Sequence, residues 1–234
     1  ACARLGAMLL PLNWRLAPPE HAYILANAEP KLLLAEEEFR AGLESILPGL
    51  PSIGSCRFGA DETQWFGATA GPDAPAAGTG DSPVLLVYTS GTTGRPKGAV
   101  LTQDALEWNA RNSAGMHDLK AADRVLTVLP MFHVGGLNIQ TMPALCAGAE
   151  VVLHRRFDPG ATLAAIAADR PTLCVLVPAT MQALIDHPQW AAADLSSLRC
   201  VTTGSSIVPS HLIHAFHRRG VPVIQVYGST ETAP

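Results

Sequence analysis

A run of hydroxyl-bearing, glycine and cationic residues follows a short aliphatic stretch near the middle of the chain. The stretch Val84–Thr89 is succeeded by Ser90-Gly91-Thr92-Thr93-Gly94-Arg95-Pro96-Lys97-Gly98. Glycine lets the backbone approach a ligand, hydroxyls and exposed amides donate hydrogen bonds, and lysine supplies a mobile positive charge. The pattern predicts a loop that binds an anion such as a triphosphate. The alternative is a flexible hairpin of small polar residues.

The order of glycine and lysine separates this loop from the usual phosphate-binding loop of nucleotide kinases. That loop has the pattern G-x-x-x-x-G-K-[ST], in which the lysine directly follows the second glycine. Here Arg95 and Pro96 stand between Gly94 and Lys97, and Gly98 takes the place of the final hydroxyl residue. We therefore expect a different type of anion-binding loop.

Two later segments place polar groups where strands are expected to end. His133 follows Leu129-Pro130-Met131-Phe132 and precedes Gly135 and Gly136, which would let a substrate approach the backbone. The second segment is Tyr227-Gly228-Ser229-Thr230-Glu231-Thr232. A lone histidine is more often structural, an aromatic residue at a strand end is most often in the core, and a loop carboxylate is most often solvated. These patterns alone leave both interpretations open.

Metal, hydrolase and disulfide patterns are weak or missing in the sequence. His211, His214 and His217 are spaced i, i+3, i+6 on an expected helix, but three residues turn a helix by about 300°, so the outer two diverge and a metal site is disfavoured. There is no G-x-S-x-G motif of hydrolases. The five cysteines include no C-x-x-C pair and are odd in number, which indicates a reduced, cytoplasmic setting.

Length and composition bound the class of protein. The chain has 234 residues, of which 48% are hydrophobic and 15% charged, so it can bury a sizeable core and is not disordered. Its net charge of −4 gives no overall positive field for nucleic acid or an anionic membrane, so we expect neither as a partner. Apolar stretches such as Leu173–Pro178 fall far short of the roughly 20 residues of a membrane span.

Beyond residue 83, short aliphatic runs alternate with helix-like stretches. The expected strands are Val84–Thr89, Arg124–Leu129, Val151–His154, Leu173–Val177, Cys200–Thr203 and Val223–Tyr227. The expected helices are Asp104–Ala114, Leu137–Ala147, Ala161–Ala168, Ala179–Asp186 and Ser210–Arg219. This alternation predicts an α/β fold with mostly parallel, helix-covered sheets, whose ligands lie beyond the carboxyl ends of the strands.

The N-terminal third predicts a β-α-β opening and then a linker. Ala7–Leu12 is expected to be a buried strand, Pro18–Asn27 a helix with proline in its first turn, and Lys31–Ala35 a strand. Gly67–Pro83 consists largely of Ala, Gly and Pro, which predicts a flexible surface segment.

Three motifs together resemble those of the adenylate-forming (AMP-binding) superfamily. Tyr88–Gly98 is similar to its signature loop, Leu129–His133 to its L-P-x-F-H segment, and Tyr227–Thr232 to its Y-G-x-T-E motif. The superfamily includes acyl-CoA synthetases such as fatty-acid–CoA ligases, firefly-type luciferases and peptide-synthetase adenylation domains. The order and separation of the motifs fit this family from about Gly6 to Pro234. The fold implied is the layered core of the family's N-terminal domain.

The resemblance implies activation of a carboxylic acid by ATP, with release of pyrophosphate, followed by transfer of the acyl group to coenzyme A. Lys97, Thr230, Glu231 and His133 would be the catalytic residues, and Thr89 and Glu231 would lie near Mg²⁺. The ATP-binding residues implied are Thr89, Ser90, Gly91, Thr92, Thr93, Gly94, Lys97, Gly204, Ser205, Ser206, Tyr227, Gly228, Ser229 and Thr230. At Gly204-Ser205-Ser206 the family usually has Gly-Ala-Pro or Gly-Gly-Ala, so the two serines depart from its pattern.

The same resemblance implies an acyl pocket and separates subclasses of substrate. Its expected rim is Met131, His133, Gly135, Gly136, Asn138 and Ser205. Peptide-synthetase domains typically have Phe-Asp where this chain has Phe132-His133, and their aspartate pairs with the substrate's amino group. A carboxylic acid without an α-amino group is therefore expected. Which acid it is cannot be read from these residues.

By resemblance, the chain is expected to be part of the family's large N-terminal domain, because no ribose-binding Tyr/Phe-Arg-Thr-Gly-Asp motif and no C-terminal lid domain occur in it. The 234 residues alone are expected to be inactive or weakly active, and association into a homo-oligomer stays open. The alternatives are a non-catalytic nucleotide-binding module, an ATP phosphotransferase, a luciferase-like oxygenase, and an adenylating enzyme that passes the acyl group to a carrier-protein thiol.

Overall fold

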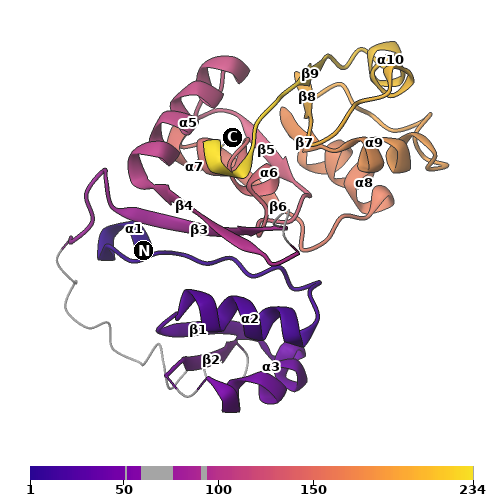
Figure 1. Ribbon diagram of the computed structural model, residues 1–234. Coiled ribbons are helices and arrows are strands. Elements are labelled where there is room, and N and C mark those ends of the chain that lie inside the picture. Colours follow the sequence, from indigo (N-terminus) through magenta and orange to yellow (C-terminus); the bar gives the residue numbers. More distant parts are fainter. Residues whose placement is uncertain (51, 59–75, 91–93, 234) are drawn as a thin grey trace. The chain divides into compact units, whose positions relative to one another are not determined.

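The computed structural model describes residues 1–50, 52–58, 76–90 and 94–233, and Figure 1 shows the course of the chain. By the density of their internal contacts, the residues form two compact units, Ala1–Val100 and Leu101–Pro234. No described helix is both long and apolar enough to cross a membrane. The loop after Thr89 therefore belongs to the first unit, while the His133 and Glu231 segments belong to the second.

The first unit contains two small sheets. Strands β1 (Leu32–Glu36) and β2 (Gly54–Phe58) pair in parallel, with Leu32 opposite Gly54. Strands β3 and β4 form the second sheet. The remaining elements and bounds are α1 (Cys2–Leu5), α2 (Pro18–Ala28), α3 (Arg40–Ile46), β3 (Pro83–Thr89), β4 (Lys97–Thr102) and the 3-10 turns Glu37–Phe39 and Leu47–Gly49.

Predictions for the N-terminal third are confirmed in two of three elements. The helix expected at Pro18–Asn27 is α2, and the strand expected at Lys31–Ala35 is β1. The buried strand expected at Ala7–Leu12 is wrong, because Leu9 makes only an isolated bridge to Leu85 and its side chain is 47% exposed. The parallel pair is instead joined through α3, which the sequence analysis did not identify.

The linker prediction lies mostly outside the described residues. Of the segment Gly67–Pro83, residues 67–75 are not described. The described residues 76–82 contain no helix or strand.

The second unit is built on one parallel sheet with strand order β6-β5-β7-β8-β9 (Figure 1). Its strands are β5 (Arg124–Thr127), β6 (Glu150–Leu153), β7 (Leu173–Leu176), β8 (Cys200–Thr203) and β9 (Val223–Gln225). Its helices are α5 (Gln103–His117), α6 (Val134–Leu137), α7 (Thr141–Ala147), α8 (Pro159–Asp169), α9 (Pro178–Ile185) and α10 (Ser210–Arg218), with a 3-10 turn at Thr230–Thr232.

Helices cover both faces of this sheet, so its central strands β7 and β8 are buried along their whole length. On one face, Leu126, Leu176 and Val201 pack against apolar residues of α8, α9 and α10. On the other face, Val125 and Leu173 pack with Ala144 of α7. The α/β fold with a mostly parallel, helix-covered sheet is therefore confirmed.

Three local details differ from the sequence-based expectation. Strand β3 pairs with β4 rather than entering the five-stranded sheet. The single helix expected at Leu137–Ala147 is divided into α6 and α7 by residues 138–140, whose side chains are buried. The strand expected to reach Tyr227 ends at Gln225, so Tyr227 lies beyond the sheet.

An ionic cluster joins the amino ends of the central strands. The Asp123 carboxylate, whose side chain is 7% exposed, pairs with the Arg199 guanidinium at 2.8 Å. Thr172 donates to Asp123 at 2.7 Å, and the Lys120 amide donates at 2.8 Å. Burial alone would raise the pKa of Asp123, but these hydrogen bonds and the positive charge of Arg199 lower it below its usual range. The cluster fixes the end of the sheet opposite the candidate site.

Candidate functional site

The candidate phosphate loop joins β3 to β4 in the first unit. Ser90 is exposed, Gly94 has a positive φ of 81°, and Lys97 begins β4 with its side chain exposed. The Thr89 hydroxyl donates to the carbonyl oxygen of Lys97 at 3.5 Å, which ties the two ends of the loop. The expected ligands Gly91, Thr92 and Thr93 lie outside the described residues.

Helix α2 holds both ends of this loop. The Tyr88 hydroxyl on β3 donates to Oδ1 of Asn27 at 2.5 Å. One turn earlier on α2, the Tyr23 hydroxyl donates to the carbonyl oxygen of Pro96 at 3.4 Å, and the Arg95 guanidinium lies 5.9 Å from the centre of the Tyr23 ring. Burial, and to a lesser extent Tyr23, raise the pKa of Tyr88. Tyr23 and Asn27 are positioning residues that the sequence analysis missed, although their i, i+4 spacing on one helix was readable.

In the second unit, the other two motifs follow the carboxyl ends of parallel strands. The Leu129–His133 segment comes after β5, Gly204 directly follows β8, and Tyr227 lies two residues beyond β9. These ends share one edge of the sheet, where ligands of parallel α/β proteins bind. The sequence analysis predicted this placement.

Close packing brings the His133 segment to the Gly204-Ser205-Ser206 loop. A Cβ atom added to Gly135 would lie 3.1 Å from Nδ1 of His133 and 3.8 Å from Oγ of Ser205. A Cβ on Gly136 would lie only 2.3 Å from the carbonyl oxygen of Pro130, so this position requires glycine. The expected acyl-pocket residues His133, Gly135 and Ser205 are therefore neighbours.

The His133 ring is held in one tautomer. Its Nδ1 atom accepts a hydrogen bond from the Gly135 amide at 3.0 Å, which caps α6 and leaves the proton on Nε2. The residue is exposed, yet neighbouring chain removes enough water from the ring to lower its pKa. At neutral pH the free Nε2–H is therefore available to donate to a carboxylate oxygen.

Buried polar atoms without a protein partner lie behind these loops. Asn138 is 0% exposed, and neither its amide nitrogen nor its amide oxygen has a hydrogen-bond partner among the described residues. The same holds for Oε1 of Gln140 and Oγ1 of Thr203. Buried polar groups are normally paired, so these atoms have spare hydrogen-bonding capacity for water or for a polar group of a substrate. Asn138 was among the expected pocket residues.

The Ser205 and Tyr227 side chains are exposed to solvent. Ser205 adopts a left-handed conformation with φ 68°, and Ser205 and Ser206 are both exposed. Tyr227 is 100% exposed, so the interpretation of this residue as part of the core is wrong. An exposed aromatic ring at a strand end is available to stack on a base.

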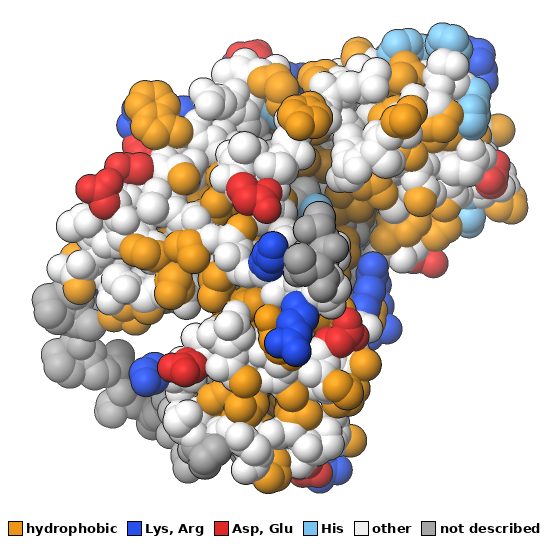
Figure 2. Space-filling model, viewed as in Figure 1, with side chains coloured by type: hydrophobic (Ala, Val, Ile, Leu, Met, Phe, Trp, Pro, Cys, Tyr) orange, Lys and Arg blue, Asp and Glu red, His pale blue; other side chains and the backbone are white. Residues whose placement is uncertain are grey.

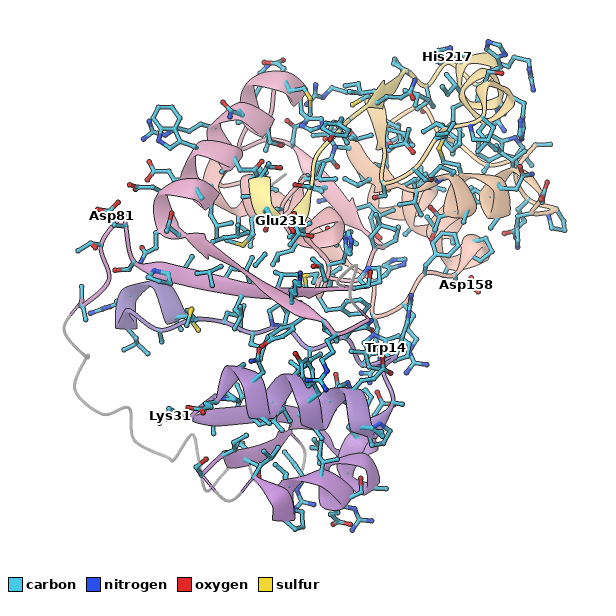
Figure 3. All side chains as sticks on the ribbon, in the orientation of Figure 1. Trp14, Lys31, Asp81, Asp158, His217 and Glu231 are labelled. Carbon is cyan, nitrogen blue, oxygen red and sulfur yellow. The ribbon has the colours of Figure 1, made fainter. Side chains whose placement is uncertain are left out.

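The Tyr-Gly-Ser-Thr-Glu motif ends in a short 3-10 turn, Thr230–Thr232. The Ser229 amide donates to the Thr232 hydroxyl at 3.1 Å, and that hydroxyl donates to the Ser229 carbonyl at 2.9 Å. The turn buries Thr230, which is 8% exposed, and leaves Gly228, Ser229 and Glu231 exposed. Figure 3 shows the Glu231 side chain on this turn. An exposed carboxylate of this kind suits Mg²⁺.

The histidines of α10 lie on the surface of this helix. His211, His214 and His217 are exposed, and Figure 2 shows histidine side chains gathered at the end of the molecule that carries α10. His211 Nε2 lies 3.0 Å from Oε1 of Gln182. Among the described residues, no group of three or more His, Cys, Asp or Glu side chains is arranged to hold a metal.

Comparison with known proteins defines the class. The AMP-binding enzyme family matches residues 1–234, and the chain belongs to this family. It is 53% identical to the indoleacetate–CoA ligase of Aromatoleum aromaticum, covering 100% of this chain and 47% of that protein. It is 40% identical to a feruloyl-CoA synthase of an Amycolatopsis species, covering 100% of this chain and 46% of the relative.

Solved structures give the same answer for the fold. The anthranilate CoA ligase AuaEII in complex with anthranoyl-AMP is 26% identical, with a TM-score of 0.91 over 98% of this chain and 46% of the other. The N-terminal domain of FACL13 from Mycobacterium tuberculosis is 30% identical, with a TM-score of 0.90 over 99% of this chain and 59% of that domain. The chain thus spans about half the length of the curated relatives it matches.

Proposed function

We propose that the protein containing this chain is an AMP-forming acid–thiol ligase. A carboxylate attacks the α-phosphate of ATP, pyrophosphate leaves, and the thiol of coenzyme A then takes the acyl group and releases AMP. The observation that carries this proposal is the match of the AMP-binding family over residues 1–234, together with relatives named as CoA ligases. In this proposal the present chain supplies the phosphate loop, the His133 segment and the Tyr-Gly-Ser-Thr-Glu motif.

The phosphate loop would hold the β- and γ-phosphates. Ser90 and Lys97 are exposed at its two ends, so a hydroxyl and an ammonium group are available to an anion there. The left-handed Gly94 lets the backbone turn between them. Charge builds up on the phosphate oxygens as pyrophosphate leaves, and fixed donors of this kind stabilise it.

The Tyr-Gly-Ser-Thr-Glu motif would contact the rest of the nucleotide. The exposed Tyr227 ring would stack on adenine, and Thr230 would bond the α-phosphate. Thr89 and Glu231 offer a hydroxyl and a carboxylate, the oxygen donors that Mg²⁺ prefers, so each has the chemistry of a Mg²⁺ ligand. Bound Mg²⁺ would neutralise phosphate charge.

His133 would orient the acid. Its Nε2–H would donate to a carboxylate oxygen of the acid, because Nδ1 is occupied by the Gly135 amide. Gly136 lets the backbone pack closely against the Pro130 carbonyl, which fixes the turn that carries His133. We propose an aromatic or arylacetic acid as the substrate class, since the relatives are named for indoleacetate and ferulate and a structural neighbour binds anthranoyl-AMP.

The thiols support a proposal for the cellular setting. All five cysteines are free, and a cytoplasmic location is proposed because reduced cysteines are typical of that compartment.

The test is carboxylate-dependent exchange of pyrophosphate into ATP by the full-length protein. The panel spans indoleacetic, cinnamic, benzoic, fatty and amino acids, and Lys97→Ala serves as the inactive control. Exchange driven by an arylacetic or aromatic acid, followed by acyl-CoA formation, is the expected result. Exchange without acyl-CoA formation would favour a carrier-protein acceptor. No exchange with any acid, in a protein that still binds ATP, would instead favour a non-catalytic nucleotide-binding module.

A further inference from the structure

A buried histidine lies behind the candidate site and belongs to none of the motifs. His117 is the last residue of α5 and is 3% exposed. Its Nδ1 atom lies 2.9 Å from the carbonyl oxygen of Ser113 and 3.1 Å from the Ser113 hydroxyl. Its Nε2 atom lies 2.8 Å from Oγ1 of Thr202 on β8. Thr202 in turn accepts a hydrogen bond from Nε2 of Gln140 at 3.0 Å.

The partners of this chain assign the proton on Nδ1 of His117, and a neutral ring then assigns the remaining protons. The Ser113 carbonyl can only accept, so Nδ1 of His117 must carry a proton. The Ser113 hydroxyl donates to the carbonyl oxygen of Ile139 at 2.5 Å and is therefore not the donor to Nδ1. When the ring is neutral, Nε2 carries no proton, so the Thr202 hydroxyl donates to Nε2 while its oxygen accepts from Gln140. The bonds run in one direction, from Gln140 to Thr202 to His117 to Ser113.

The surroundings favour the neutral imidazole that this direction requires. Burial lowers the pKa of His117, and the nearby Arg199 charge acts the same way, although the Ser113 carbonyl opposes both. Arg199 also donates to the His117 carbonyl oxygen at 3.3 Å, and its own charge is balanced by Asp123. The chain of hydrogen bonds is therefore intact at neutral pH.

Two segments of the candidate site are joined through this chain. Thr202 precedes Gly204 by two residues on the strand that leads into the Gly204-Ser205-Ser206 loop. Gln140 follows Asn138 by two residues at the end of the segment that begins at His133, and it is 1% exposed. Asn109, also on α5, donates to the Asn138 carbonyl at 2.8 Å, so the helix reaches this segment at a second point.

We propose that His117 is a positioning residue: with its proton on Nδ1, it accepts from Thr202 and so holds the His133–Asn138 segment and the Gly204–Ser206 loop in register for the acid and the nucleotide. Its effect on turnover rests on the proposed function. The hydrogen-bond chain itself does not, because it is a property of the second unit alone.

The matched variants are Thr202→Val and Thr202→Ser in the full-length protein. Valine keeps the volume of Thr202 but removes the hydroxyl, which leaves His117 and Gln140 unpaired. Serine keeps the hydroxyl and removes a methyl group. A purely packing role makes serine the more harmful change, whereas positioning through the hydrogen bond makes valine the more harmful one. Thermal unfolding of both variants confirms that they are folded.

Three measurements decide the proposal. Nitrogen NMR of 15N-histidine-labelled protein, assigned with a His117→Gln variant, should show His117 with its proton on Nδ1. The chemical shift of Nε2 should be kept in Thr202→Ser and altered in Thr202→Val, where the hydroxyl donor to Nε2 is lost. In exchange assays, Thr202→Val should lower kcat/KM for the acid by about tenfold, mainly through KM, because segments that are no longer held in register misplace the acid. Hydrogen exchange at residues 133–138 and 204–206 should be faster in Thr202→Val than in Thr202→Ser.

Failure of this proposal is distinct from failure of the proposed function. An Nε2-protonated His117, or equal kinetics and equal amide exchange in the two Thr202 variants, would overturn the positioning role. If the unaltered protein shows no pyrophosphate exchange with any acid, the proposed function fails, and the tautomer and amide-exchange measurements still decide the role of His117.

Discussion

The hydroxyl of Tyr88, the residue before the last on β3, donates a hydrogen bond to Oδ1 of Asn27 on α2 at 2.5 Å. This bond fixes the strand that leads into the candidate phosphate loop to a helix more than sixty residues earlier in the chain. Tyr23, one turn before Asn27, holds the other end of the loop through the Pro96 carbonyl at 3.4 Å. The loop is thus anchored at its entry and its exit by one face of α2.

Removing the Tyr88 hydroxyl, which anchors the start of the loop to Asn27, should weaken ATP binding. We expect Tyr88→Phe to raise KM for ATP about fivefold, because a typical hydrogen bond contributes about 1 kcal/mol, and to leave KM for the acid unchanged. Pyrophosphate exchange at varied ATP concentration measures this. Tyr23→Phe is the control and should have a smaller effect, since its bond is longer. Equal increases in KM for ATP and acid would show that the bond is a general folding contact.

The backbone at Gly136 is closed to any side chain. A Cβ atom there would lie 2.3 Å from the Pro130 carbonyl oxygen and 2.8 Å from that of Leu129. Gly136→Ala should therefore displace the His133 segment and lower kcat/KM for the acid by at least about tenfold, as small misplacements of a site commonly do. Gly42→Ala, in α3, is the matched control because no atom lies within 4 Å of its Cβ position. Equal kcat/KM values for the acid in Gly136→Ala and Gly42→Ala would contradict the requirement for glycine at position 136.

The ion pair between Asp123 and Arg199 should make stability depend on acid pH. A carboxylate whose pKa is lower in the folded state stabilises the fold above its unfolded pKa near 4, and this contribution is lost as the pH falls through the folded pKa. We expect Asp123→Asn to cost about 2 kcal/mol at pH 7. The difference from the unaltered protein should shrink below about pH 4. Urea unfolding at several pH values measures both.

The control for this experiment is the exposed Asp194. Hydrogen bonds from Ser196 and Arg170 lower its pKa to about 2, but its partners lie in solvent, where ion pairs contribute little. Asp194→Asn should therefore change stability much less than Asp123→Asn. A larger effect at Asp194 would contradict the assignment of the buried cluster as the stabilising one.

The sequence predicted a mostly parallel, helix-covered sheet because its strands are continuous apolar runs separated by helical periods, although Val84–Thr89, expected among these strands, pairs with β4 instead. Leu173–Leu176 and Cys200–Thr203 are buried along their length, so their pattern does not depend on a distant partner. Met8 and Leu9 show the limit of this reasoning, because both side chains are about half exposed although they belong to an apolar run. An apolar run identifies residues that could be buried, but it does not show whether another element packs on them. Strand β4 was missed because Lys97–Thr102 has only Leu101 fully buried.

The sequence motifs of the candidate site could be predicted, but the contacts between them could not. The resemblance gave His133, Gly135 and Ser205, and the structure brings these three together. The anchors Tyr23, Asn27 and His117 carry no motif, because each acts through a single hydrogen bond to a residue far along the chain. Such contacts become visible only when the fold has placed the partners side by side.

The His133 tautomer gives a prediction for pH. Desolvation lowers the pKa of His133, so the neutral ring with Nε2–H should persist below the ordinary histidine value near 6.5. Protonating Nδ1 would break the 3.0 Å bond from the Gly135 amide, so kcat/KM for the acid should fall as the pH drops through this lowered value. NMR titration of the ring and a pH profile of exchange should give the same midpoint.

Replacing the ring separates binding of the acid from binding of ATP. We expect His133→Ala to lower kcat/KM for the acid by about a hundredfold, because it removes both the donor to the carboxylate and the cap of α6, with KM for ATP changed less than threefold. His214→Ala, on the exposed face of α10, should leave both unchanged. In the NMR titration, a midpoint at or above pH 6.5 would show that the His133 ring is solvated. In the kinetic assay, an unchanged kcat/KM for the acid in His133→Ala would show that this residue does not contact the acid.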